Sequence, residues 1–373
     1  MKERTFFLCA GEASGDLHGA NLMKSMRALE PKVHFVGVGG PKMRAEGLEC
    51  LREAETLSVV GLVEVLKNFS FFKKALEDLS REVVSRDVEA FIPIDFPDFN
   101  LRLCEKVKPK GVKVIYYVCP QVWAWRRSRV HQIARVVDVL LTIFPFEAKY
   151  FDENKLRVEF IGHPLCDEIE RGERPELPEK GRGVLCLMPG SRHSEIDHHL
   201  PLLAPFIKKF LDQFPEAEVH IPCAQTLVTD DIWKHLGELK GIRGLVVHDP
   251  GQSEKVLESC DAALIASGTS TLQGVLSHRP LALFYRLNPI TYWIGTKIID
   301  LPYVGLANLV AGKEVHREYI QGEMSPDKLL LEAERLLWDA GERKRMLDDF
   351  EDIHEKLGGP GASDRVASIV LGD

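Results

Sequence analysis

Short apolar runs recur along the first half of the chain, each followed by turn residues and then by apolar positions at helical spacing. Runs of this kind are typical of strands that are buried on both faces of a parallel sheet. Strands are therefore predicted at residues 5–10, 33–36, 90–94, 112–118, 139–143 and 158–161. Strands that alternate with helices imply a parallel, doubly wound α/β sheet.

The same pattern restarts after residues 168–182, which are rich in Glu, Arg, Pro and Gly and are typical of a linker. Further strands are predicted at residues 184–188, 218–221, 245–248, 262–266 and 281–284. Residues 325–357 predict a long helical region broken at Gly341, and residues 362–371 predict a short last helix. Two similar halves suggest a cleft between them, where ligands of open α/β sheets bind.

The length of the chain supports this division, because 373 residues exceed one typical core. We expect two Rossmann-like domains at residues 1–166 and 183–345, joined by a linker at 167–182. Residues 346–373 are expected to form C-terminal helices that can pack back on the first domain.

The net charge of −8 argues against a general nucleic-acid binder, but one segment has the opposite charge. Between Leu101 and Arg135 there are nine Lys or Arg residues and a single acid, Glu105. A basic segment in an acidic protein suits an anionic partner, and a solvated face is the alternative.

Eight scattered cysteines without a Cys-x-x-Cys pair are typical of buried thiols in a reducing compartment. The first apolar run, residues 5–10, is too short for a signal peptide. No apolar run approaches the roughly 18 residues needed to span a bilayer. We therefore expect a cytoplasmic protein.

Two loops in the second half have phosphate-binding character. After the strand at 262–266 comes Ser267-Gly268-Thr269, and Ser270 and Gln273 have the spacing of a capping box. A strand, a small-residue loop and a helix N-terminus present free N–H groups and a positive dipole end to an anion. An ordinary strand-to-helix turn without a ligand is the alternative.

The second loop, Pro189-Gly190-Ser191-Arg192, follows the strand at 184–188. Two such loops from non-adjacent strands can converge on one diphosphate, and the fork of Arg192 suits a phosphate. A surface arginine after a turn is the alternative. His193, His198 and His199 match no closed metal site, so a solvated helix face is expected there and no metal.

In the first half, Asp95, Asp98 and Asn100 follow the strand at 90–94, where active-site loops lie. One of these carboxylates could take a proton from a hydroxyl nucleophile, whereas the alternative is a helix cap.

The segment 117–129 contains Trp123 and Trp125 beside Arg126, Arg127 and Arg129. Such residues can stack on a sugar or lipid and hold a phosphate. A structural tryptophan cluster with surface arginines carries equal weight.

Residues 57–79 are apolar and aromatic with lysines at the edge, which suits a helix in a membrane interface or a groove for acyl chains. A core-packing helix is the default alternative. The membrane-facing candidates are Val63, Leu66, Phe69, Phe71 and Phe72.

Seven motifs occur in one order along nearly the whole chain: Gly11-Glu12-Ala13-Ser14-Gly15-Asp16, then residues 94–100, 120–129, 162–165, 189–192, 266–272 and 308–312. Together they resemble the lipid-A-disaccharide synthase family, glycosyltransferases of the GT-B architecture.

The resemblance implies an inverting hexosyltransferase of lipid A, and hence lipopolysaccharide, biosynthesis. It would move 2,3-diacylglucosamine from its UDP derivative to 2,3-diacylglucosamine 1-phosphate, releasing UDP and forming a β-1,6 disaccharide 1-phosphate. In this family the C-terminal domain binds the nucleotide and the N-terminal domain takes the acceptor, without a metal or cofactor. A peripheral position on the inner face of the inner membrane follows, and a homodimer is possible.

Carried over by motif, Asp98 is the base or orients it. Donor-side candidates are Gly190, Ser191, Arg192, Ser267, Gly268, Thr269, Ser270, Thr271, Gln273 and Asn308. Acceptor-side candidates are Glu12, Ser14, Gly15, Asp16, Asp95, Asn100, Trp123, Arg126, Arg127 and Arg129. Gln273 stands where a glutamate is usual in such families, and Ala307 where a proline is expected.

Two alternatives belong beside this interpretation. One is a GT-B relative that acts on a soluble UDP-sugar, such as an epimerase, against which the apolar and basic segments argue. The other is a nucleotide-sugar-binding protein without catalysis, against which Asp98 argues beside a complete phosphate-binding set.

Overall fold

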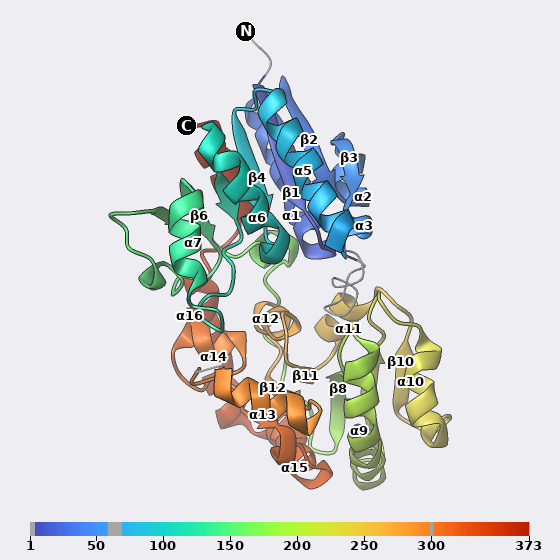
Figure 1. Ribbon diagram of the computed structural model, residues 1–373. Coiled ribbons are helices and arrows are strands. Elements are labelled where there is room, and N and C mark those ends of the chain that lie inside the picture. The colour runs from blue at the N-terminus through green and yellow to red at the C-terminus, as the bar shows by residue number, and fades with distance from the viewer. Residues whose placement is uncertain (1–3, 59–68, 299–300, 373) are drawn as a thin grey trace. The chain divides into compact units, whose positions relative to one another are not determined.

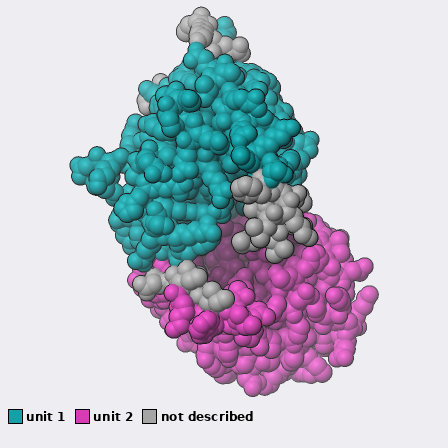
Figure 2. Space-filling view, in the orientation of Figure 1, with its two compact units in different colours: residues 1–167, 357–373 teal, residues 168–356 magenta. Residues whose placement is uncertain are grey.

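The computed structural model describes residues 4–58, 69–298 and 301–372. The chain divides into two compact units, Met1–Asp167 with Leu357–Asp373 and Glu168–Lys356 (Figure 2). Each unit is built on one parallel sheet with helices on its faces (Figure 1). The predicted pair of doubly wound α/β sheets is therefore confirmed.

Unit 1, the part with both chain ends, contains a seven-stranded sheet in the order β3-β2-β1-β4-β5-β6-β7. Its strands are β1 Arg4–Ala10, β2 Val33–Gly39, β3 Glu49–Glu53, β4 Ala90–Ile94, β5 Ile115–Tyr117, β6 Val139–Thr142 and β7 Arg157–Phe160. Its helices are α1 Ala13–Leu29, α2 Pro41–Ala45, α3 Ala54–Ser58, α5 Phe69–Ser85, α6 Pro97–Val107, α7 Arg129–Val136, α8 Leu165–Glu168 (whose last residue belongs to unit 2) and α17 Ala362–Leu371.

Alternation along β1 explains why this sheet is buried on both faces. Phe6 and Leu8 pack with residues of α1 and α17, whereas Phe7 and Cys9 pack with residues of α5, α6 and α7. Successive side chains of a strand point to opposite faces, so a continuous apolar run serves both layers. The C-terminal helix α17 packs directly on α1, and this joins the end of the chain to its beginning.

Unit 2 contains a six-stranded parallel sheet in the order β10-β9-β8-β11-β12-β13. Its strands are β8 Arg182–Met188, β9 Glu216–Pro222, β10 Leu245–His248, β11 Ala262–Ala266, β12 Leu281–Tyr285 and β13 Glu318–Ile320. Its helices are α9 His193–Gln213, α10 Thr229–Leu236, α11 Ser253–Ser259, α12 Ser270–Leu276, α13 Pro289–Ile298, α14 Leu306–Ala311, α15 Pro326–Trp338 and α16 Ala340–Lys356.

The break in the long C-terminal helical region lies at Asp339, so the prediction of Gly341 was wrong. The backbone of Asp339 is extended, and its N–H donates to the carbonyl of Arg335 at the end of α15. Its Oδ1 accepts the N–H of Glu342, 3.0 Å away, in the first turn of α16. One aspartate therefore ends one helix and caps the next.

Residues 168–182 are polar but ordered, because arginines of unit 2 satisfy their carbonyl groups. Arg279 donates to the carbonyl of Glu173 at 2.8 Å, and Arg343 donates to that of Glu176 at 3.1 Å. This stretch is thus held on the surface of unit 2.

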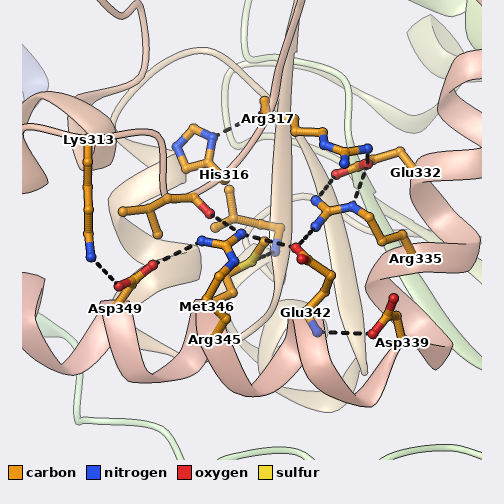
Figure 3. A network of polar contacts seen from close by, with 12 residues as sticks. Lys313, His316, Arg317, Glu332, Arg335, Asp339, Glu342, Arg345, Met346 and Asp349 are labelled. Atoms are coloured by element: carbon orange, nitrogen blue, oxygen red, sulfur yellow. Dashed lines mark hydrogen bonds and ion pairs between the residues drawn. The ribbon is translucent and has the colours of Figure 1, made fainter.

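A network of polar contacts around a buried carboxylate fixes α15 and α16 against β13 (Figure 3). Glu332 is fully buried, and its Oε2 accepts from the hydroxyl of Tyr319 and from Nε of Arg335, both at 2.9 Å. Lys313 reaches Asp349 of α16 at 2.6 Å. Because a buried carboxylate is costly without partners, this network defines the position of the α14–β13 segment.

Among the described residues, no helix has both the length and the apolar composition needed to cross a bilayer.

Candidate active site

The two predicted phosphate loops leave neighbouring strands of unit 2. β8 and β11 are hydrogen-bonded to each other, with Met188 beside Ile265. They are non-consecutive in sequence but adjacent in the sheet, which corrects the expectation of non-adjacent strands. From β8 the chain continues to β9 on one side, whereas β11 lies on the other. Ligands of open α/β sheets bind at such a switch point, outside the carboxyl ends of the strands.

The loop after β11 presents unpaired N–H groups. Within the described part of the chain, no acceptor is found for the N–H groups of Gly268, Thr269 and Ser270. The predicted capping box does not form, because Thr269 precedes α12 and no side chain caps the helix. Instead the buried hydroxyl of Thr271 donates to the carbonyl of Gly268 at 2.8 Å and shapes the turn. The N–H groups remain available to an anionic oxygen.

The loop after β8 is wrapped around the carboxylate of Glu195, on the first turn of α9. Glu195 is buried; its Oε2 accepts the N–H of Ser191 at 2.9 Å, and its Oε1 accepts from Arg192 at 2.8 Å. Gly190 has φ +121°, and a Cβ there would lie 2.5 Å from Oε2 of Glu195. Only glycine fits this position without strain.

Glu195 is held in its ionised form. Burial raises the pKa of its carboxyl group, but the bonds from Ser191 and Arg192 outweigh this and leave the pKa below its ordinary value. The carboxylate therefore orients Arg192, whose side chain is exposed at the same edge of the sheet.

His199 joins the β8 loop to the end of a third strand, β12. Its Nε2 accepts the N–H of Arg286 at 3.0 Å, so its Nδ1 carries the proton donated to the carbonyl of Pro189 at 2.7 Å. Burial lowers the pKa of His199, which keeps the imidazole neutral. The hydroxyl of Tyr285 also reaches Glu195, at 3.2 Å.

The sequence analysis did not single out Glu195 or Tyr285 as site residues. It expected His199 on a solvated helix face, and that expectation was wrong. The signal for His199 was its helical spacing from Ile196 and Leu203, which places all three on the inner face of α9. His193 and His198 lie on the exposed face.

Asn308 is buried and its amide is occupied by the protein. Nδ2 donates to the carbonyl of His316 and to Glu318, and Oδ1 accepts the N–H groups of Val315 and His316. Glu318 also accepts the N–H groups of Val304 and Gly305 before α14. Asn308 therefore holds α14 against β13.

Unit 1 has a switch point of its own between β1 and β4, where Ala10 pairs with Ile94. The start of α1 and the loop 95–100 follow these strands. Asp95 and Phe96 both have positive φ, +46° and +50°, which is rare for residues other than glycine. Asn100 holds this conformation by donating to the carbonyls of Cys9 at 3.1 Å and Asp95 at 2.8 Å.

Asp95 has a perturbed environment at this edge. Burial, together with the neighbouring carboxylate of Glu12, raises the pKa of Asp95 to about 6. Strained backbone and a shifted pKa at a switch point are typical of functional sites.

Asp98 lies on the first turn of α6, with 65% of its side chain exposed. Arg126, at 2.7 Å, and Arg129 both donate to its Oδ1. Its Oδ2 accepts no hydrogen bond from the residues that the structure describes. The two guanidinium groups also lie over the ring of Trp125, 4.3 and 5.6 Å from its centre. The structure therefore brings the acidic loop and the basic tryptophan segment together.

Comparison with known proteins decides between a lipid A transferase, an epimerase-like enzyme and a non-catalytic nucleotide-sugar-binding protein. The family model described as lipid-A-disaccharide synthetase matches residues 6–368. The lipid-A-disaccharide synthase of Nitrosococcus oceani is 39% identical over 370 residues, which cover 98% of this chain and 95% of the relative. The chain belongs to the lipid-A-disaccharide synthase family.

Solved structures agree at the level of the fold. The glycosyltransferase of kitacinnamycin superposes with a TM-score of 0.68 at 16% identity, covering 100% of this chain and 99% of that one. MurG of Acinetobacter baumannii gives 0.60 at 13% identity, covering 99% and 100%. The protein is a hexosyltransferase of lipid A disaccharide synthesis with a GT-B fold, and the epimerase-like and non-catalytic alternatives are not favoured.

Several acceptor-side candidates inferred from the family occupy structural positions. Trp123 is buried against Phe144 and Phe146 and donates to Glu147 at 2.9 Å, so it is not placed to stack on a ligand; Trp125 is the exposed one. Asp16 is buried and accepts three N–H groups at the start of α2, and Gly15 lies against β1 and β4. Glu12, Ser14 and Arg127 are exposed.

The membrane-facing candidates divide in a similar way. Val63 and Leu66 lie outside the described residues. Phe69 is the first residue of α5. Phe71 is exposed, whereas Phe72 packs against Phe99, with ring centres 6.3 Å apart. One of the five is thus seen at the surface.

Proposed function

We propose that the donor is UDP-2,3-diacylglucosamine, bound by unit 2, and that the acceptor is 2,3-diacylglucosamine 1-phosphate, bound by unit 1. The observation that carries the donor assignment is the convergence of the Gly190–Arg192 and Ser267–Thr269 loops at one switch point. The products are the β-1,6-linked disaccharide 1-phosphate and UDP.

The diphosphate has two sets of donors in this proposal. The N–H groups of Gly268, Thr269 and Ser270 have no acceptor among the described residues, and Arg192 supplies a positive charge. An arginine has five N–H donors, so its bond to Glu195 is compatible with a second bond to a phosphate oxygen. These groups stabilise the negative charge that develops on UDP as the sugar leaves.

The other donor-side residues either position the loops that hold the diphosphate or contact the nucleoside. Thr271 shapes the loop through its bond to Gly268, and Asn308 positions α14 because its amide is already occupied. Gln273, half-buried on α12, is assigned to the ribose, where an amide can bond a hydroxyl as a carboxylate does. Ser191, Ser267 and Ser270 belong to the same loops and are assigned to the donor as further hydrogen-bonding groups.

Asp98 is assigned as the base. Its Oδ2 accepts the proton of the acceptor 6-hydroxyl as that oxygen bonds the anomeric carbon and the carbon–oxygen bond to UDP breaks. Arg126 and Arg129 fix the carboxylate of Asp98 by donating to its Oδ1. Their guanidinium groups are also assigned to bind the phosphate of the acceptor. Asp95 is the competing base, supported by its raised pKa.

A peripheral membrane position suits substrates that carry acyl chains. We assign it to the inner face of the inner membrane, with the apolar stretch 59–72 and the basic segment 101–135 as the contacting parts of unit 1. Phe71, exposed on α5 with Arg52 near its ring, supports this assignment. A homodimer is a further proposal, to be measured by light scattering.

The donor site is tested by UDP binding to Arg192→Ala. We expect a loss of about 2–3 kcal/mol, the scale of a charge-assisted contact, in calorimetry with UDP. The matched control is Arg182→Ala, an exposed arginine at the opposite end of β8 that pairs with Glu216. Equal UDP affinity in the two variants would remove Arg192 from the site.

A further inference from the structure

One helix of unit 2, α13, exposes three large apolar or aromatic side chains within four residues. α13 exposes 71% of Ile290 and 64% of Trp293, and Tyr292 between them is also exposed. Its threonines and Lys297 are exposed as well. Large apolar side chains that gather on the surface of a folded domain mark a site of interaction.

The helix is a well-formed element with a fixed origin. Asn288 caps its start by accepting the N–H of Ile290 at 2.9 Å, and its carbonyl accepts the N–H of Tyr292. Two residues earlier, the N–H of Arg286 is held by His199, and the carbonyl of Leu287 accepts from Gln321 at 3.2 Å. α13 is thus attached to the same loops that the donor site uses.

The composition of the helix indicates which partner covers it. From Arg286 to Ile298 there are two basic residues, Arg286 and Lys297, and no acid. Tryptophan and tyrosine with flanking basic residues are typical of helices that lie in a lipid interface, where the rings reach the acyl boundary and the charges meet anionic head groups.

A second copy of the chain fits less well. Three partly exposed side chains of this size offer about 400 Å² at most, taking 150–250 Å² for a whole aromatic residue. A stable protein interface needs about 800 Å² from each partner. A lipid surface has no such minimum, because affinity there grows with each inserted side chain.

We propose that α13 is a membrane-contacting helix of unit 2, which inserts Ile290, Tyr292 and Trp293 into an anionic bilayer beside the donor site. This rests on the proposed function, because the acylated donor must be taken from a membrane. In this proposal unit 2 has a membrane-contacting surface of its own, α13, in addition to the segments assigned to the membrane in unit 1. The acylated donor would enter unit 2 from the bilayer beside α13.

The double variant Ile290→Ser/Trp293→Ser tests the helix by co-sedimentation with vesicles of equal parts phosphatidylcholine and phosphatidylglycerol. We expect the dissociation constant for vesicles to rise about tenfold or more, from the apolar area no longer inserted. The matched control is Leu331→Ser, because Leu331 on α15 is 69% exposed in the same unit, and its vesicle binding should not change. UDP affinity should be unchanged in both.

A second measurement needs only a conservative change. Brominated phospholipid in the vesicles should quench part of the tryptophan emission of the wild type, and Trp293→Phe should reduce that quenching; quenching that remains is assigned to Trp125 of the basic segment in unit 1. Equal quenching in the wild type and in Trp293→Phe would overturn the proposal. So would a double variant that binds vesicles as tightly as the wild type, or one that differs from the wild type only in its oligomeric state. A wild type that binds UDP but no vesicles would overturn this inference and the peripheral position together, while leaving the donor site intact.

Discussion

Asp95→Asn should stabilise the protein at alkaline pH, although it alters a residue of the candidate site. Asn keeps the size of the side chain and suits the left-handed backbone at φ +46°. Its oxygen can still accept the bond from the N–H of Phe96 that the carboxylate accepts. What the substitution removes is a negative charge held among buried groups and beside Glu12.

The size and sign of the effect follow from the raised pKa. A change from 3.8 to about 6 corresponds to about 3 kcal/mol at 1.36 kcal/mol per unit. Asp95 is only half-buried, so solvent screening reduces this to about 1–2 kcal/mol. A raised pKa means that the folded state binds the proton more tightly, so the wild type is relatively destabilised above pH 6 and regains stability as the pH falls toward 4.

Thermal unfolding of both proteins at pH 8, 6 and 4 measures the prediction. At pH 8 the Asp95→Asn variant should melt higher by a few degrees, at about 2–4 °C per kcal/mol for a domain of this size, and the difference should vanish near pH 4. The comparison variant is Asp98→Asn, whose exposed ion pairs are worth about 0–1 kcal/mol, so its melting temperature should stay the same or fall. A lower melting temperature of Asp95→Asn at pH 8 would refute the reasoning.

Further outcomes concern catalysis and packing. Asp98→Asn should lower turnover by about 10²-fold or more while UDP affinity survives, as expected for loss of a general base. If Asp95→Asn lowers turnover in this way instead, and activity of the wild type is lost below pH 6, Asp95 is the base and Asp98 is not. Gly190→Ala should destabilise unit 2 by about 1–3 kcal/mol in denaturant unfolding and weaken UDP, because of its positive φ and the contact with Glu195; unchanged stability would contradict the loop geometry. Trp123→Phe should destabilise by about 1–3 kcal/mol by leaving the buried carboxylate of Glu147 short of one donor, with the acceptor KM unchanged; a large KM effect would return Trp123 to the acceptor site.

The sheets could be predicted because nearly every central strand is an apolar run buried on both faces. β3 and β13 were missed, since both lie at sheet edges, where burial is partial. β3 reads Glu-Cys-Leu-Arg-Glu, and charged residues at an edge protect against unwanted pairing, so the pattern carries no strand signal.

The site was predictable to the extent that its residues follow strand ends. Arg192 and Asp98 were proposed in this way. Helical spacing places His199 on the inner face of α9, but the contacts of Glu195 and His199 with Tyr285 and Arg286 join segments about 90 residues apart in the sequence, which no local pattern reveals. Local sequence also cannot say which of two neighbouring tryptophans faces inward. Residues such as Asn308 have motif positions yet satisfy the backbone of their own unit.

The central claim is the transfer reaction itself. Purified protein should be incubated with UDP-2,3-diacylglucosamine and 2,3-diacylglucosamine 1-phosphate, and the products analysed by mass spectrometry and NMR. The account predicts one UDP for each β-1,6-linked disaccharide 1-phosphate, with no UDP released when the acceptor is left out. UDP released equally without the acceptor, or an epimerised UDP-sugar with no disaccharide, would contradict it.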